Sequence, residues 1–73
     1  MNKKPIIKML NIITERNPSL RDTFQYTYIM RIMEKDARTI AYAEKMYVRD
    51  NLRSLCAVAG LSYERLLMKV CRK

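Results

Sequence analysis

The chain has 73 residues, with no histidine, no tryptophan, one glycine, two prolines and two cysteines. The absence of histidine excludes the commonest general acid and base, histidine-containing zinc sites and the dyads that pair histidine with serine or cysteine. So short a chain also has little room for a buried active site. We therefore expect no enzyme activity, no cofactor, and no catalytic or metal-binding residue.

Long apolar runs and linkers are also lacking. No apolar run reaches the roughly 18 residues that a membrane-spanning helix requires. The basic start is followed by an apolar run that Lys8 and Asn11 interrupt, without the small residues of a signal-peptide cleavage site. No repeat or Gly/Ser-rich stretch divides the chain. We expect one helical domain over residues 1–73, located in the cytoplasm, with a core that supplies only about 3–5 kcal/mol.

What the chain has in excess is positive charge. Fifteen lysines and arginines against seven acidic residues give a net charge of +8. Residues 1–21 and 51–73 each carry a net charge of +4, whereas the charges of residues 22–50 cancel. Such an excess favours nucleic acid or another polyanion as partner, provided that the cations of the two ends lie on one surface. The alternative is that they only solubilise the helices.

The two cysteines, Cys56 and Cys71, are 15 residues apart, and neither belongs to a Cys-x-x-Cys motif. Both lie in segments with helical apolar periodicity. We expect buried free thiols in a reducing compartment, and a disulfide between them stays open as an alternative.

Apolar side chains recur at steps of three and four along most of the chain, which predicts an all-α fold, a single small domain of four to five short helices. Pro5 suits the first turn of a helix, Asn17-Pro18 ends it, and Ser19 with Asp22 resembles the capping box of the next one. The expected helices cover approximately residues 5–16, 19–34, 36–47, 51–59 and 62–72.

Two features of the middle segment allow other interpretations. Residues 24–32 also alternate with the period of a strand, but no turn dipeptide for a hairpin is nearby, so we favour a helix for residues 20–34. A set of tyrosines is interleaved with arginines and could stack on the bases of a single strand. We expect core packing with the hydroxyls reaching solvent instead. The tyrosines are Tyr26, Tyr28, Tyr42 and Tyr47, and the arginines are Arg31, Arg38 and Arg49.

The last third of the chain predicts two helices that meet at a sharp turn. A cap at Asp50 or Asn51 would open the first helix, and Gly60 falls where a residue with left-handed backbone ends it. Ser62 would cap the second helix. The expected apolar sides are Leu52, Leu55, Cys56 and Ala59 on the first helix, and Tyr63, Leu66, Leu67, Val70 and Cys71 on the second.

This arrangement resembles the helix-turn-helix family over residues 52–71. Cys56 takes the small, tightly packed position, Gly60 the turn glycine and Leu61 the turn hydrophobic, with Leu55, Ala59 and Leu66 in the core positions. The chain departs from the family at Lys69, where a hydrophobic residue is expected. The stretch from Cys56 to Val70 also resembles small bacteriophage-encoded proteins with a Cys-x-x-Ala-Gly-Leu core, which implies a phage or prophage origin and a regulatory or nucleic-acid-associated role.

The helix-turn-helix resemblance implies that the second helix lies in a major groove. Arg65 is then the candidate for contacting a base, because arginine donates two hydrogen bonds to guanine. Ser62 and the neighbouring backbone amides would meet a phosphate. The other expected phosphate contacts are Arg53, Lys69, Arg72 and Lys73, together with Lys4 and Lys8 of the first helix. The alternative is that these residues form only a solvated face.

The sequence thus favours a small basic DNA-binding accessory or regulatory protein, with RNA as a further possibility. The alternative is a phage inhibitor or adaptor that docks on an acidic host protein. The broadly apolar helix expected at residues 5–16 favours this alternative, because part of its cover could come from a partner or from a second copy in a homodimer. A helix lying on a membrane surface is a third possibility, favoured by the lysines beside the same apolar run.

Overall fold

The structure is a computed structural model that describes residues 2–72. In this range the chain forms four α-helices, two short 3₁₀-helices and no strand. The elements are α1 (Lys3–Arg16), η1 (Pro18–Asp22), α2 (Phe24–Met33), η2 (Ala37–Thr39), α3 (Tyr42–Val58) and α4 (Tyr63–Cys71). The predicted all-α small domain is confirmed, and residues 24–33 are helical, so the strand alternative is wrong.

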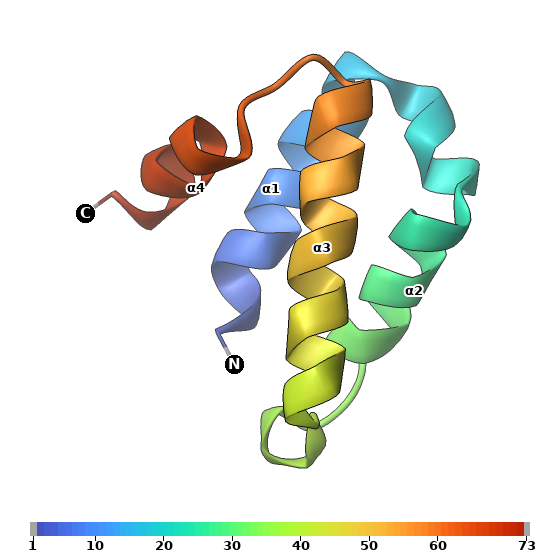
Figure 1. Ribbon diagram of the computed structural model, residues 1–73, viewed down its shortest axis with the longest axis vertical. Helices are drawn as coiled ribbons and strands as arrows, with labels where there is room; N and C mark the ends of the chain where they lie inside the picture. The colour runs from blue at the N-terminus through green and yellow to red at the C-terminus, as the bar shows by residue number, and fades with distance from the viewer. Residues whose placement is uncertain (1, 73) are drawn as a thin grey trace.

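The helices form a flat unit of 32 × 31 × 16 Å, with α3 in the middle, α2 on one side and α1 on the other (Figure 1). The C-terminal helix α4 lies beyond α1 and packs mainly against it. Only Leu66 of α4 is buried, so most of the core lies between α1, α2 and α3. The largest fully buried side chains there are Met9, Leu10, Ile13, Ile29, Val48, Leu52, Leu55 and Cys56.

The first helix begins two residues earlier than expected. Asn2 is its N-cap, because the Asn2 side chain accepts a hydrogen bond from the backbone N–H of Lys4 at 3.3 Å. Pro5 therefore lies inside the first turn, where its missing N–H costs no hydrogen bond. The polar stripe predicted on this helix is exposed along its whole length. It consists of Lys4, Lys8, Asn11 and Glu15.

The second expected helix, residues 19–34, starts later than predicted. Its first residues form the 3₁₀-helix η1, and Thr23 is the N-cap of α2, accepting from the N–H of Tyr26 at 3.2 Å. The Ser19 hydroxyl donates to Asn17 at 2.6 Å rather than capping a helix. The predicted capping box at Ser19 and Asp22 is therefore wrong.

The expected helices at 36–47 and 51–59 are one continuous helix, α3, which starts only at Tyr42. Asp50 and Asn51 lie in its middle and cap nothing. The helix continues through them because the buried residues Val48, Leu52 and Leu55 keep their spacing on both sides, and a polar residue inside a helix costs only a few tenths of a kcal/mol. At the N-terminus of α3, Glu44 accepts from the N–H of Ala41 at 2.9 Å.

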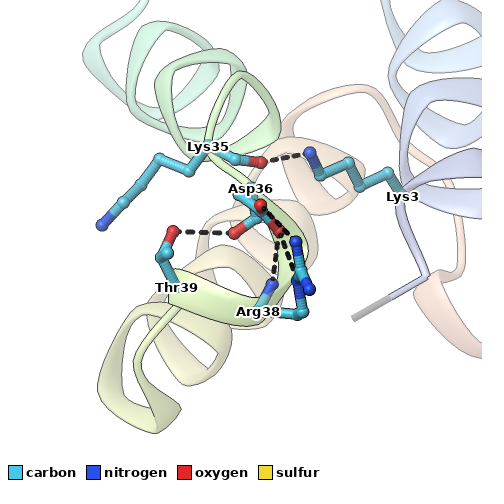
Figure 2. Close-up of polar contacts among 5 residues, drawn as sticks. All are labelled: Lys3, Lys35, Asp36, Arg38 and Thr39. Atoms are coloured by element: carbon cyan, nitrogen blue, oxygen red, sulfur yellow. Dashed lines mark hydrogen bonds and ion pairs between the residues drawn. The ribbon is translucent and has the colours of Figure 1, made fainter.

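Polar contacts hold the connection between α2 and α3 (Figure 2). The Lys3 ammonium of α1 donates to the backbone carbonyl of Lys35, and the Asp36 carboxylate accepts from the N–H of Arg38 at 3.0 Å. Thr39 donates its hydroxyl to the carbonyl of Asp36 at 2.8 Å. The side chain of Lys35 pairs with Glu44 at 2.9 Å, so the start of α3 is fixed to the end of α2.

The tyrosines divide between two environments. Tyr26 and Tyr28 are half-buried, as expected. Tyr47 meets Tyr28 edge to face, with 6.3 Å between ring centroids, yet remains 60% exposed, and Tyr42 is 77% exposed. The expectation that all four rings pack in the core is wrong for Tyr42, the first residue of α3, and for Tyr47, which contacts Tyr28 of α2 but stays mostly exposed.

The turn between α3 and α4 is the one that the sequence predicts. Gly60 has a φ of 72°, in the left-handed region. The N–H of Leu61 donates to the carbonyl of Cys56 at 2.8 Å, and the N–H of Gly60 donates to that of Ala57 at 3.2 Å. This pair of bonds is a Schellman motif, which satisfies the last carbonyls of the helix. Arg16 adds a third contact, its Nε donating to the Ala59 carbonyl at 2.7 Å.

Replacing Gly60 tests the left-handed backbone. A Cβ at this position would meet only the Arg16 guanidinium at 3.9 Å, so the strain comes from the backbone and not from crowding. We expect Gly60→Ala to lower the free energy of unfolding by about 1 kcal/mol, and Gly60→Asn to lower it less, because asparagine tolerates this conformation. Urea denaturation followed by circular dichroism measures both; equal stability of Gly60→Ala and the parent would contradict the assignment.

Stability should also depend on pH through Glu44. The hydrogen bond from Ala41 and the contact with Lys35 lower the pKa of Glu44 below its ordinary 4.5. A lowered pKa contributes stability that is complete above pH 4.5 and is lost as the pH falls through the folded-state value. We expect Glu44→Gln to flatten the acid side of the stability profile. Part of the slope should remain, because the N–H and guanidinium of Arg38 also lower the pKa of Asp36.

The matched control for this measurement is Glu34→Gln, which removes a carboxylate that forms no ion pair with any residue from 2 to 72. Urea denaturation across the acid range should give the parent's slope for this variant. A parental slope for Glu44→Gln would show that the contacts of Glu44 do not stabilise the fold.

Candidate nucleic-acid interface

The two basic ends of the chain meet where α4 packs on α1 (Figure 1). Lys8 of α1, Lys69 of α4 and Arg72, the C-cap of α4, line one shallow depression of about 360 Å³. Lys4 and Lys8 line a second depression with Val70 of α4. Four cations that are far apart in the sequence therefore belong to adjoining parts of one surface.

Helical spacing continues this surface along the outer face of α4. Arg65, Met68 and Lys69 follow steps of three and four on α4, and Arg72 is the C-cap just beyond the helix. All four are exposed, and together they line a depression of about 350 Å³. Leu66 is buried on the opposite side of the helix. Because the Leu66 side of α4 packs against the rest of the fold, the residues that were predicted to face outward are exposed to solvent.

We call Lys4, Lys8, Arg65, Lys69 and Arg72 the cationic surface. None of the five forms an ion pair with another residue of the described range 2–72. The acidic residue nearest to them in sequence on α4, Glu64, lies 3.8 Å from the guanidinium of Arg53 instead. The positive charge of this surface is therefore not neutralised within the described part of the molecule.

The remaining candidate residues have other positions. Arg53 on α3 lines none of these depressions and stacks on the Tyr63 ring, with its guanidinium carbon 4.9 Å from the ring centroid. Ser62 is the N-cap of α4, as predicted, and accepts from the N–H of Arg65 at 3.4 Å. Both residues thus help to hold α4 in place. Lys73 lies outside the described residues.

The positions that resemble a helix-turn-helix can be followed in the structure. Leu55, Cys56, Ala59 and Leu66 are buried and Leu61 is half-buried, which agrees with their expected packing roles. At the point of departure, Lys69 is exposed and the neighbouring Val70 packs against the core instead. The helix pair thus keeps an inward apolar side although Lys69 breaks the pattern.

Among residues 2–72, no group of three or more acidic or cysteine side chains is arranged to hold a metal ion. In the same range, no helix combines the length and the apolar character needed to cross a bilayer.

Comparisons with protein family models, curated proteins and solved structures found no match to this chain.

Sequence patterns predicted the burial of one cysteine correctly but not the exposure of the other. Both thiols are free, Cys56 is buried as expected, but Cys71 is exposed, so the prediction of a buried thiol is wrong there. Cys71 is the last residue of α4, beyond the part of the helix that packs on the core. Burial, with a smaller contribution from the negative charge of Glu64, raises the pKa of the Cys56 thiol.

The two thiols should therefore react at different rates with a reagent such as dithionitrobenzoate. We expect Cys71 to react promptly in the folded protein and Cys56 to react only as fast as the fold opens, because the thiolate is the reactive species and burial disfavours it. The Cys71→Ser variant should retain only the slow phase, and denaturant should abolish the difference. Two fast phases in the native protein would contradict the burial of Cys56.

Proposed function

We propose that this protein binds nucleic acid, DNA in the first place, through the cationic surface and without catalytic chemistry of its own. The observation that carries the proposal is the gathering of five cations without acidic partners from the two ends of the chain. A surface of this kind attracts phosphate by charge and by release of counterions.

In this proposal, α4 is the helix that faces the groove. Its nine residues span about 13 Å, and the major groove of B-DNA is about 12 Å wide. Arg65 lies in the first turn of α4, where a helix-turn-helix protein contacts bases, and it is the candidate for contacting guanine. Lys69 and Arg72 would then contact phosphates on one side of the groove.

The lysines of α1 extend the contact beyond a single helix. Lys4 and Lys8 are one turn apart on the exposed stripe of α1, and they border the same depressions as α4. We assign both to the phosphate backbone, because lysine acts as a point charge without the planar geometry that reads bases. Arg53 and Ser62 contribute indirectly by holding α4. The proposal includes an accessory or regulatory role in the cytoplasm. If the protein is phage-encoded, this is the cytoplasm of the host.

A salt titration of DNA binding tests this proposal. With five cations at the surface, we expect log K to fall against log salt with a slope of up to about 4.5, at roughly 0.9 per phosphate neutralised. Lys8→Ala and Lys69→Ala should each weaken binding and reduce the slope by about one unit. Arg65→Ala should cost about 1–3 kcal/mol on the preferred sequence and relax the preference. Fluorescence anisotropy of labelled duplexes measures all three.

The control for these variants is Arg31→Ala, which removes the same charge from α2, where Arg31 borders a separate depression with Arg21 and Glu34. It should bind DNA like the parent. The absence of measurable binding to duplex or single strands at ~50 mM salt, or an equal loss in Arg31→Ala, would refute the proposal.

A second candidate function is docking onto an acidic protein. The observation that favours it is Met68, which is 74% exposed in the middle of the outer face of α4. Methionine reads no base well but adapts to varied protein surfaces. This function predicts a complex that weakens on Met68→Ser, whereas DNA binding through the cationic surface predicts little effect of that substitution.

A further inference from the structure

Residues of α1, α3 and α4 enclose an apolar trough that adjoins the depression bordered by Lys4 and Lys8. Its bottom is formed by Met9 of α1 and by Val48 and Leu52 of α3, all less than 3% exposed. The half-buried Ile6 of α1 and Leu67 of α4 stand above them. We call this space, of about 330 Å³, the trough. None of the five residues of the cationic surface lines it.

The trough exists because α1 lies between α3 and α4 (Figure 1). The Gly60 turn carries α4 away from the axis of α3, and residues of α1, α3 and α4 all line the trough. Tyr63, at the start of α4, is one of them. Its ring stacks with the guanidinium of Arg53, whose carbon lies 4.9 Å from the ring centroid.

Charge at the trough has one sign. Lys45 and Arg49, one turn apart on α3, are both exposed and both line it, and none of the described residues that line it is acidic. Neither cation forms an ion pair within residues 2–72. Within residues 2–72, the one hydrogen bond of the Arg49 guanidinium goes to the sulfur of Met46 at 3.1 Å, which leaves its charge without a counterion.

Apolar walls with one or two charged groups at the edge are the usual form of a small-molecule site. From the trough, with its volume at the low end of such sites, we infer a binding site for a small amphipathic anion: a carboxylate on a short hydrocarbon chain. The chain lies against Ile6 and Leu67, and the carboxylate meets Arg49 and Lys45. This inference goes beyond the proposed function and does not depend on it.

Competition against a fluorescent reporter tests the site on the whole chain. Anilinonaphthalene sulfonate is the reporter, and octanoate and 1-octanol are the two competitors, equal in chain length and different in charge. We expect octanoate to displace the reporter at lower concentration than octanol. Arg49→Gln and Lys45→Gln should each weaken octanoate roughly fivefold, the size of an exposed charge contact, and leave octanol unchanged. Equal displacement by the two competitors would overturn the inference.

Arg31→Gln on α2 is the matched control, because it lowers the net charge equally but lies outside the trough. It should bind octanoate like the parent, and a fivefold loss there would reduce the effect to net charge and overturn the site. The thermal unfolding of the Arg49→Gln and Lys45→Gln variants should match that of the parent, since both cations are exposed and form no ion pair within residues 2–72. If Arg49→Gln unfolds, Arg49→Lys replaces it and should retain octanoate binding.

The exposed thiol of Cys71 gives an independent readout, since it also lines the trough. Octanoate should slow maleimide labelling of Cys71 over the concentrations that displace the reporter. Lys4→Gln and Lys8→Gln should show the same protection. These two lysines border the neighbouring depression that Cys71 also lines, so unchanged protection separates the trough from the cationic surface. Unchanged labelling at saturating octanoate would overturn the site, as would protection that increases with protein concentration alone, because a second copy would then occupy the trough.

Discussion

The reversal of the chain at Gly60 determines which surface the C-terminal cations reach. Its left-handed backbone ends α3 and redirects the chain, so that α4 meets α1 and does not continue along α3. Arg16, the last residue of α1, donates to the carbonyl of Ala59 just before the turn. The end of one helix thus caps the end of another, and a cation at a helix C-terminus is favourable to the helix dipole. Both candidate surfaces depend on where this turn sends α4.

The pairing of charges differs between the middle of the chain and its two ends. In the middle of the chain, acids and bases neutralise each other over short distances, as Lys35 does with Glu44 and Arg38 with Asp36. At the two ends, the five cations of the cationic surface form no ion pair within residues 2–72, and the fold places the ends beside each other. Gathering like charges costs stability through repulsion, and the Debye length of about 8 Å at physiological salt does not screen neighbours on one helix face. A bound polyanion would relieve this repulsion.

Sequence patterns predict the features that local chemistry decides. Gly60 and Ser62 have the roles expected of them, since only certain residues suit a left-handed turn or an N-cap. Sequence patterns fail where tertiary packing outweighs local preference. Asp50 is a typical N-cap residue, yet α3 continues through it because the spacing of apolar residues is the same on both sides. The exposure of Cys71 and the shape of the trough depend on how α4 is placed relative to α3. The apolar periodicity within one helix does not predict this placement.

The weakest-anchored helix is also the one that both surfaces share. Leu66 is the only fully buried residue of α4, and Tyr63, Leu67 and Val70 pack against the core half-buried, so α4 has fewer fully buried residues than α1, α2 or α3. The other restraints are the Gly60 turn before the helix and the stacking of Arg53 on Tyr63 at its start. Elements with few buried contacts open at low free-energy cost. A phosphate backbone that joins Lys8 to Lys69, or an anion that joins Arg49 to the wall at Leu67, would therefore stabilise α4 against α1 and α3.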